Sequence, residues 1–327
     1  MKAIIPLAGR GTRLRPHTYT KPKPMVHVAG KPILGHVLDR LTGLPIQEII
    51  FITGYMGDQI EEYVQSCFSY NAKYVQQLEM KGQAHAVYLA QQHISDLDDV
   101  LIVFIDTIFE ADLKDLPGLE ADGVIYVKEV EDPSRFGVVV VEGDQVVRLV
   151  EKPDRPVSKL VNIGLYYVKN SGLLFSSIEE QMKRNIKTKG EYYLTDAFQI
   201  MIERGARIKA LPVDVWEDCG NPDTLLATNR YLLENGMSRE IKTENSVIIP
   251  PVYLEDGVKV KNSVVGPYVS VAAGSEIANS IVQNSIVNRN SIVEATLCHD
   301  SIIGENVLIK GRPKKINVGD SSEVVLD

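Results

Sequence analysis

The chain of 327 residues is 44% apolar and 24% charged, a composition typical of a folded globular protein rather than a disordered one. Its formal net charge of −8 argues against a broad basic face for nucleic acid polymers or acidic membranes. The three cysteines stand far apart without a CxxC pair, which favours a reducing compartment and argues against a zinc site of the usual spacing. No run reaches the ~20 apolar residues of a membrane span, and Pro6 and Gly9 interrupt the N-terminal stretch too early for a signal peptide, so we expect a cytoplasmic protein.

Short apolar runs alternate with helical patterns through the first two thirds of the chain. The runs AIIPL (3–7), EIIFIT (48–53) and VLIVFI (100–105) predict strands. Apolar residues three to four apart in ILGHVLDRL (33–41) and QIEEYVQSC (59–67) predict helices. This order predicts an α/β domain with a mostly parallel sheet.

From about residue 123 the pattern becomes rich in strands. Four runs carry it: GVIYVKEV (123–130), GVVVVE (137–142), VVRLVEKP (146–153) and NIGLYYV (162–168). They predict an insertion or lid built on extra strands, before helices return near 171–186, 195–205 and 221–235. Residues 234–245 are polar without apolar periodicity, so we expect a first domain at 1–235, a linker at 236–245 and a second domain at 246–327.

The second predicted domain contains a short repeat. NSVVG, NSIVQ, NSIVN, NSIVE, ATLCH and DSIIG begin at residues 262, 279, 284, 290, 295 and 300. A small polar residue followed by aliphatic ones at a near-hexapeptide period is typical of a parallel β-helix, whose coils present an aliphatic side chain inward at each turn. A β-sandwich of short strands is the alternative, but its strands would be spaced by roughly 8–12 residues. Because stacked coils leave flat ends and faces, we also expect a homo-oligomer.

The first 38 residues contain no acidic side chain and seven cations: Lys2, Arg10, Arg13, Arg15, Lys21, Lys23 and Lys31. Gly9 and Gly11 follow the first predicted strand and allow the main chain to approach an anion closely. The segment has neither a Walker motif nor a dinucleotide fingerprint. The pattern predicts a local site for one triphosphate, with a solvated basic loop as the alternative.

The full string resembles a known family. AGRGTRLRP (8–16), KPKPM (21–25) and GKPIL (30–34) are similar to the N-terminal signature of the sugar-1-phosphate nucleotidyltransferases, and the likeness continues for most of the chain. The resemblance implies a Rossmann-like nucleotidyltransferase domain followed by a small left-handed parallel β-helix. It implies a nucleotide site at Leu7, Ala8, Gly9, Gly11, Thr12, Arg13, Gln77 and Gly82, with catalytic roles for Arg13, Lys23 and Asp106.

Further stretches fit the same family pattern. They place sugar-phosphate contacts at Gly137, Glu151, Lys152 and Asn162, and metal ligands at Asp106 and Asp218. Each has an ordinary alternative: Gln77 as a solvated loop residue, Asp106 as a cap or turn residue, the Glu151 and Lys152 pair as an edge-strand surface pair, and Asp218 as part of a turn before a helix.

The implied reaction needs no nucleophilic side chain. The oxygen of a sugar 1-phosphate attacks the α-phosphorus of a nucleoside triphosphate, pyrophosphate leaves, and Arg13 and Lys23 stabilise the accumulating charge. Mg²⁺ is the expected cofactor, since two carboxylates suffice for an ion that keeps water and phosphate ligands. The partners are thus the two small substrates, with no nucleic acid polymer and no membrane.

The substrate pair stays open in the sequence. The form of the motifs together with the β-helix favours dTTP or UTP and glucose 1-phosphate, and a mannose-1-phosphate guanylyltransferase remains an alternative. Ile105 stands where relatives commonly have glycine, so a non-catalytic regulatory homologue that binds nucleotide sugars is a second hypothesis. A third is acyl transfer by His299, the one histidine of the repeat domain, although a solvated surface residue is the more ordinary reading of a lone histidine.

Overall fold

The computed structural model describes residues 1–155, 157–311 and 316–325. The chain divides into two compact units. The first, here named the sheet unit, comprises Met1–Gly9 and Val37–Trp216, and the second, the β-helix unit, comprises Arg10–His36 and Glu217–Asp327. Within the described ranges no helix combines the length and apolar character needed to cross a membrane.

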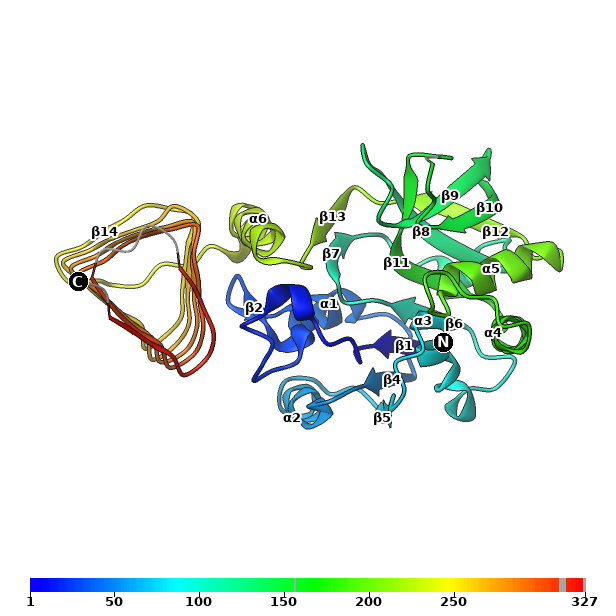
Figure 1. Cartoon of the computed structure of the whole chain (residues 1–327), viewed down its shortest axis with the longest axis horizontal. Coiled ribbons are helices and arrows are strands. Elements are labelled where there is room, and N and C mark those ends of the chain that lie inside the picture. The colour runs from blue at the N-terminus through cyan, green and yellow to red at the C-terminus, as the bar shows by residue number, and fades with distance from the viewer. Residues whose placement is uncertain (156, 312–315, 326–327) are drawn as a thin grey trace. The chain divides into compact units, whose positions relative to one another are not determined.

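A nine-stranded sheet forms the centre of the sheet unit, with the order β5-β4-β1-β6-β11-β8-β12-β10-β9 (Figure 1). The strands are β1 (Lys2–Pro6), β4 (Glu48–Thr53), β5 (Ala72–Gln76), β6 (Val100–Val103), β8 (Gly123–Glu129), β9 (Gly137–Glu142), β10 (Gln145–Glu151), β11 (Leu160–Val168) and β12 (Ile208–Pro212). Seven of them run in one direction, and β10 and β11 run against them. The prediction of a mostly parallel sheet is confirmed.

The strand-rich region after residue 123 differs from the prediction. It does not form a separate insertion or lid, because β11 pairs with β6 on one side and β8 on the other and so lies in the middle of the sheet. The hairpin of β9 and β10 continues the same sheet at its edge. Runs of consecutive buried residues, such as Val100–Val103 in β6, match a strand covered on both faces.

Four helices belong to the sheet unit: α2 (Gly57–Cys67), α3 (Gln83–Tyr88), α4 (Gly172–Lys183) and α5 (Leu194–Glu203). Helix α1 (Ile33–Leu41) begins in the β-helix unit and continues into the sheet unit from Val37, and Ile33–Leu38 are all buried. In α2, Ile60 and Val64 are buried four residues apart, which is the spacing of one helix face. Phe198 of α5 stacks on Tyr166 of β11 with ring centroids 5.1 Å apart, so α5 packs on the antiparallel part of the sheet. Strands β7 (Thr107–Glu110) and β13 (Val215–Asp218) form a separate two-stranded sheet.

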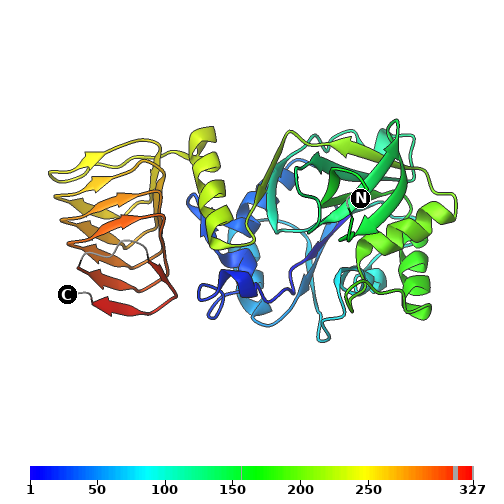
Figure 2. The same cartoon turned by 45° about the horizontal axis from the view of Figure 1, so that its top comes forward.

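Three parallel sheets form the left-handed β-helix, and Figure 2 shows its coils stacked on one another. The first sheet is β14 (Val247–Ile248), β17 (Val264–Val265), β20 (Ile281–Gln283) and β23 (Leu297–His299). The second is β15 (Val252–Leu254), β18 (Val269–Val271), β21 (Ile286–Val287), β24 (Ile302–Ile303) and β26 (Asn317–Val318). The third is β16 (Lys259–Lys261), β19 (Glu276–Ala278), β22 (Ile292–Glu294), β25 (Leu308–Lys310) and β27 (Glu323–Val325). Residues 312–315 and 326–327 of the predicted domain lie outside the described residues.

The repeated Asn-Ser pairs explain how the coils turn and how they are joined. Asn262 and Asn279 have φ values of 50° and 52°, a left-handed conformation that asparagine tolerates better than most residues. The serine after each asparagine is buried, and its hydroxyl links two coils. Ser263 Oγ accepts from Ser280 N at 3.1 Å, and Ser280 Oγ accepts from Thr296 N at 3.0 Å. Ser285 Oγ accepts from Ser301 N and Ser291 Oγ accepts from Val307 N at the other two corners, so the repeat forms ladders of buried hydroxyls at the corners of the β-helix.

The boundary between the units differs from the expected one at residue 235. Helix α6 (Pro222–Leu232) and the segment Arg10–His36 belong to the β-helix unit. Asn229 of α6 is fully buried, and its Oδ1 accepts from Ala29 N at 3.0 Å and from Ser270 Oγ at 2.7 Å. One side chain thus joins the N-terminal segment, α6 and the coils.

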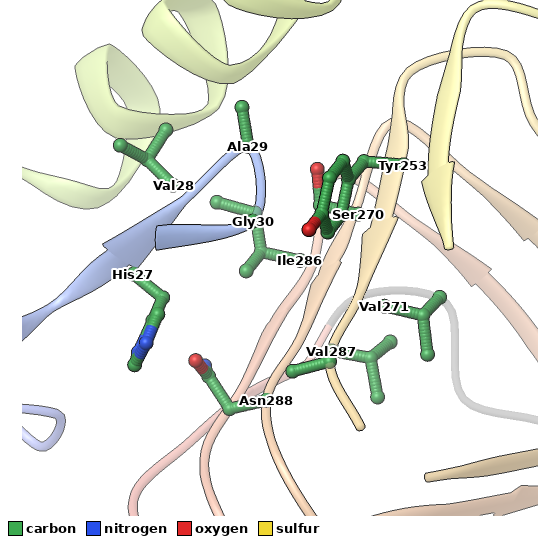
Figure 3. A pocket seen from close by; sticks show the side chains of 11 residues that line it. His27, Val28, Ala29, Gly30, Tyr253, Ser270, Val271, Ile286, Val287 and Asn288 are labelled. Atoms are coloured by element: carbon green, nitrogen blue, oxygen red, sulfur yellow. The ribbon is translucent and has the colours of Figure 1, made fainter. Parts of the chain in front are cut away.

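The N-terminal segment also packs directly on the coils. Ala29 and Gly30 form the tight turn between β2 (His27–Val28) and β3 (Lys31–Pro32). Figure 3 shows Gly30 beside the ring of Tyr253, and a Cβ on this glycine would lie 2.3 Å from that ring. Glycine is therefore required at this position.

The predicted linker at 236–245 pairs with the first coil of the β-helix. Arg239 forms a parallel bridge with Tyr253, and Glu244 forms one with Lys261. These backbone bonds and the packing of Ile241 against the β-helix core fix the segment, although its mostly polar composition suggested a linker.

We expect Ser280→Ala to destabilise the β-helix unit by about 1–3 kcal/mol, because the Thr296 N–H would lose its acceptor in the interior. The midpoint of urea unfolding measures this loss. Gln283→Ala, at an exposed position of the same coil, is the control and should change the midpoint little. Equal midpoints for the two variants would contradict the role of the ladder.

Candidate functional site

The predicted site residues lie on both units, and each group has its own local geometry. Leu7 and Ala8 follow β1 in the sheet unit and are buried, and Leu7 N donates to Ile52 O at 2.7 Å. A Cβ on Gly54, which follows β4, would lie 2.7 Å from Ala8 O. This close approach of Gly54 to Ala8 was not predicted from the sequence, since a contact between the ends of two strands has no spacing signal. Nothing lies within 4 Å of the Cβ position of Gly9, so the main chain there is open to a ligand.

Gln77 is buried, not solvated as the alternative reading had it. Its side chain is 5% exposed, and its Nε2 lies 3.4 Å from Gly82 O and 3.1 Å from His85 Nδ1. Burial lowers the pKa of His85, which favours the neutral ring that can accept this amide. Gly82 has φ +112°, and a Cβ there would lie 2.6 Å from Tyr192 O. The structure therefore brings Gln77 and Gly82, two residues of the predicted nucleotide site, together.

The predicted sugar-phosphate residues also converge. A Cβ on Gly137 would lie 2.1 Å from Asn162 Nδ2 and 2.8 Å from Glu151 Oε2. Asn162 Nδ2 donates to Gly137 O at 3.1 Å, and its Oδ1 accepts from Tyr166 OH at 2.7 Å. Strands β9, β10 and β11 supply these side chains, so the cluster is a product of sheet pairing between residues far apart in the sequence.

Glu151 is buried, Lys152 is half-buried, and both have fixed partners. Burial raises the pKa of Glu151, against the opposing effects of Thr195 and Lys152. Thr195 Oγ1 donates to Glu151 Oε2 at 2.8 Å, and Lys152 Nζ lies 3.5 Å from Glu151 Oε1. Lys152 Nζ also donates to Tyr193 OH at 2.5 Å. The reading of a solvated surface pair is wrong, because Glu151 is only 9% exposed.

Burial, hydrogen bonds and neighbouring charges shift the pKa values of the charged groups around this pair. Burial lowers the pKa of Lys152, but the hydrogen bond to Tyr193 and the charge of Glu151 outweigh it, and the net shift is upward. Burial and the nearby Glu151 charge raise the pKa of Asp196 to about 6. Thr195, Tyr193 and Asp196 come from the start of α5 and were missed in the sequence, which contains no pattern linking them to β10.

Asp106 lies between β6 and β7 and is exposed, whereas its neighbour Ile105 is 3% exposed. Phe104 N donates to Gly164 O at 2.8 Å, which fixes the chain just before these two residues. The side chain of Ile105 is directed into the protein interior, so the glycine-to-isoleucine difference at this position is accommodated by burial.

The glycine-rich loop belongs to the β-helix unit from Arg10 onward. Gly11 has φ +59°, and a Cβ there would lie 2.9 Å from the Cβ of Lys23 and 3.1 Å from Thr18 Cγ2. Thr18 Oγ1 donates to Gly11 O at 2.9 Å, and Leu14 N donates to the same oxygen at 3.0 Å. Two short 3-10 helices, Thr12–Leu14 and Lys23–Met25, complete the loop. The loop thus brings Gly11 and Lys23 into contact.

Asp218 and Arg13 lie on either side of Gly220. A Cβ on this glycine would be 2.8 Å from Asp218 Oδ1 and 3.0 Å from Arg13 Nη2. Asp218 Oδ1 accepts from Gly220 N at 2.8 Å. The next residue, Asn221, caps α6 through a reciprocal pair of bonds with Thr224, so the turn-and-helix reading of this stretch also holds. The same short turn serves both the helix and the placement of the carboxylate.

Among the N-terminal cations, Lys2 and Lys21 lie close to carboxylates. Lys2 Nζ lies 3.6 Å from Glu48 Oε2 and 3.6 Å from Asp98 Oδ2, and Lys21 Nζ lies 2.5 Å from Glu305 Oε1. These two cations have carboxylate partners within their own units, and the binding of a triphosphate by the basic loop stays a prediction.

Oxygen ligands for Mg²⁺ are present without a dense metal cluster. No group of three or more His, Cys, Asp or Glu side chains able to hold a metal occurs in the described part of the chain. Mg²⁺ needs few protein carboxylates, because water and phosphate oxygens complete its coordination. Asp106 of the sheet unit is exposed and Asp218 of the β-helix unit is half-buried, so each offers carboxylate oxygens of the kind that Mg²⁺ accepts.

His299 of β23 is exposed, and its Nδ1 lies 3.3 Å from Asp300 Oδ2. Asp300 also contacts Asn284 and lies 3.7 Å from Arg230 Nη2 of α6. This network attaches α6 to the coils, so the aspartate beside the histidine already has a structural role.

The family model described as nucleotidyl transferase matches residues 2–235, a range that includes the central sheet and the glycine-rich loop. The chain belongs to the nucleotidyl transferase family, as its motifs predicted. Among curated relatives, bifunctional protein GlmU of Methanocaldococcus jannaschii is 37% identical over 79% of this chain and 61% of its own length. The chain thus spans less than two thirds of that relative.

Two other relatives carry specific names. UTP–glucose-1-phosphate uridylyltransferase AglF of Haloferax volcanii is 35% identical over 68% of this chain and 93% of its own length. Glucose-1-phosphate thymidylyltransferase of Streptomyces antibioticus is 33% identical over 79% of this chain and 74% of its own length. Among solved structures, a putative glucose-1-phosphate thymidylyltransferase from Bacillus anthracis has a TM-score of 0.63 at 25% identity, covering 74% of this chain and 98% of that one.

We expect Gly137→Ala to destabilise the sheet unit by about 1–3 kcal/mol, because its Cβ would collide with Asn162 Nδ2 and displace Glu151. Thermal unfolding measures the loss. Gly118→Ala is the matched control, since that glycine has an ordinary φ and nothing within 4 Å of its Cβ position. A Gly137→Ala variant as stable as the control would contradict the packing described here.

Proposed function

We propose that the protein transfers a nucleoside monophosphate from a nucleoside triphosphate to a sugar 1-phosphate and releases pyrophosphate. Membership of the nucleotidyl transferase family carries this proposal. The convergence of Gly137, Glu151 and Asn162 in the sheet unit supports it, because it forms a polar cluster suited to a hydroxyl-rich ring. The regulatory homologue without activity is the alternative.

In this proposal the protein side chains act by binding and by charge. Open main chain at Gly9 and the Gly11 turn accommodates phosphate oxygens, while Arg13 and Lys23 stabilise the charge that develops on them. Lys152 neutralises the sugar phosphate, and Glu151 accepts hydrogen bonds from ring hydroxyls. Asp106 and Asp218 would hold Mg²⁺, which when bound supplies charge neutralisation of the triphosphate.

For the substrates we propose dTTP or UTP with glucose 1-phosphate. The names of the Haloferax and Streptomyces relatives support a pyrimidine nucleotide and glucose 1-phosphate. Mannose 1-phosphate with GTP is the alternative that the sequence left open. Thymine and uracil differ by one methyl group, worth about 1 kcal/mol of burial, so these two bases need a direct comparison.

The experiment measures pyrophosphate release with Mg²⁺ across dTTP, UTP, GTP, ATP and CTP against the 1-phosphates of glucose, mannose, galactose and N-acetylglucosamine. We expect release with a pyrimidine nucleotide and glucose 1-phosphate. Release in the GTP and mannose pair alone would replace the proposed substrates. Nucleotide binding without release in any pair would favour the regulatory homologue.

We expect Asp106→Asn and Asp218→Asn each to lower kcat by at least about 100-fold while leaving the fold intact, because each removes one charged oxygen ligand. Pyrophosphate release at saturating substrates gives kcat, and circular dichroism checks the fold. Asp115→Asn, at another exposed aspartate, is the control and should retain the wild-type rate. Wild-type rates in either site variant would remove that residue from the metal site.

We also propose that the protein forms a homo-oligomer through the β-helix. Val247, Ile281 and Leu297 stand at the first position of β14, β20 and β23, and their side chains are 57%, 40% and 52% exposed. An aliphatic row facing outward on one sheet is typical of a surface covered by another copy. Sedimentation of wild type and of Ile281→Lys tests this proposal, and an unchanged monomer in both would reject it.

A cytoplasmic location remains our proposal for the protein. All three cysteines are free thiols, and Cys67 is exposed. An exposed free thiol is typical of a protein in a reducing compartment. Localisation of a tagged full-length chain tests the proposal.

A further inference from the structure

Lys21 is a buried cation that the proposed reaction does not use. Its side chain is 10% exposed, and its Nζ lies 2.5 Å from Glu305 Oε1 and 3.5 Å from Asp320 Oδ2. Both carboxylates belong to the last described coils of the β-helix, and the side chain of Asp320 is only 7% exposed. Because a buried charge needs a close partner, this ion pair fixes the distance between the basic segment and the coils.

Neighbouring residues make further contacts with the same coils. Thr20 Oγ1 donates to Asp320, and His17 Nε2 is hydrogen-bonded to Asn317. Burial lowers the pKa of His17, so its ring is neutral in this interface. A Cβ on Gly319 would lie 3.0 Å from Pro16 Cβ, so the two backbones approach closely. Residues 16–21 are thus held along their length.

Asp320 is the centre of these contacts. Its Oδ1 accepts from Glu305 N at 2.9 Å, while its Oδ2 faces Thr20 and Lys21. One carboxylate therefore joins two successive coils to each other and joins both to the basic segment. Removing its charge would loosen all of these contacts together.

Residues 16–21 lie inside the loop proposed to bind the triphosphate. Gly11 packs on Thr18 and Lys23, and Thr18 Oγ1 donates to Gly11 O at 2.9 Å. Only Pro22, whose φ is restricted by its ring, separates Lys21 from Lys23. A displacement of Lys21 therefore moves both Lys23 and the Gly11 turn.

We infer that the last coils of the β-helix position the triphosphate-binding loop, with Lys21, Glu305 and Asp320 as positioning residues. This inference rests on the proposed function of the loop and assigns the β-helix a role in nucleotide binding within its own chain. The ion pair acts through the loop: Lys21 is neutralised by Glu305 and Asp320, and its effect on the nucleotide passes through Lys23 and Gly11.

The test uses the full-length Lys21→Met protein and two measurements. The first is hydrogen–deuterium exchange of residues 10–25, and the second is the KM for the nucleotide against the KM for the sugar 1-phosphate. We expect faster exchange in the loop and a KM for the nucleotide raised roughly 10- to 100-fold, with a much smaller change for the sugar 1-phosphate. Lys21→Arg, which keeps the charge, should recover most of the wild-type behaviour.

Two further variants support the comparison. Lys310→Met removes an ion pair within the β-helix, where Lys310 Nζ lies 3.0 Å from Glu294 Oε2, and it should change neither measurement. Glu305→Gln, whose side chain is 29% exposed, is the milder variant if Lys21→Met does not fold, and it should shift both measurements in the same direction.

The outcomes separate the inference from the proposed function. Unchanged exchange in the loop, or faster exchange with an unchanged KM for the nucleotide, would overturn the inference. Equal effects of Lys21→Met and Lys310→Met would also overturn it, because general loosening of the coils would then explain both. A wild-type protein without turnover for any substrate pair would reject the proposed function. The exchange measurement and nucleotide binding measured by calorimetry would then decide the inference on their own.

Discussion

The ion pair between Lys21 and the carboxylates of Glu305 and Asp320 is the contact on which the arrangement of the β-helix unit depends. It joins a segment near the N-terminus to coils almost three hundred residues later. A buried ammonium group without a partner would be costly, so the segment and the coils have to meet in one register. Asn229 links distant segments in the same way but with neutral groups, since its buried Oδ1 accepts hydrogen bonds from two different segments.

Close backbone approach is the second constraint, and it is met by glycine at a few places. Gly137 leaves room for Asn162 and Glu151, and Gly220 leaves room for Asp218 and Arg13. At each place the missing side chain lets polar groups from separate elements converge on one point. The positions of the site residues therefore depend both on the space that these glycines leave and on the charged side chains around them.

The sequence predicted those features that depend on local pattern. Apolar runs located the strands, and the Asn-Ser repeat predicted the coils because every coil meets the same requirement at its corner. The sequence did not predict which strands are neighbours, so β8 and β11 were assigned to a lid although they lie within the sheet. Apolar periodicity reports burial and says nothing about the pairing partner.

The same limit applies to the candidate site. The family resemblance located Gly137, Glu151 and Asn162, which the structure brings together, whereas Thr195 has no motif and is recognisable only through its bond to Glu151. The pairing of Lys21 could not be read from the basic segment, since its partners lie in distant coils.

The contacts of the segment Arg10–His36 extend from the first coil to the last one described. Gly30 packs on Tyr253 in the first coil, and Lys21 pairs with Asp320 in the last one described. Successive coils are about 4.8 Å apart, so losing or duplicating one coil would shift one anchor by that distance while the other stayed in place. Repeat domains ordinarily change length freely during evolution. Here the segment Arg10–His36 contacts both coils, so a change in the number of coils between these contacts would break one of them.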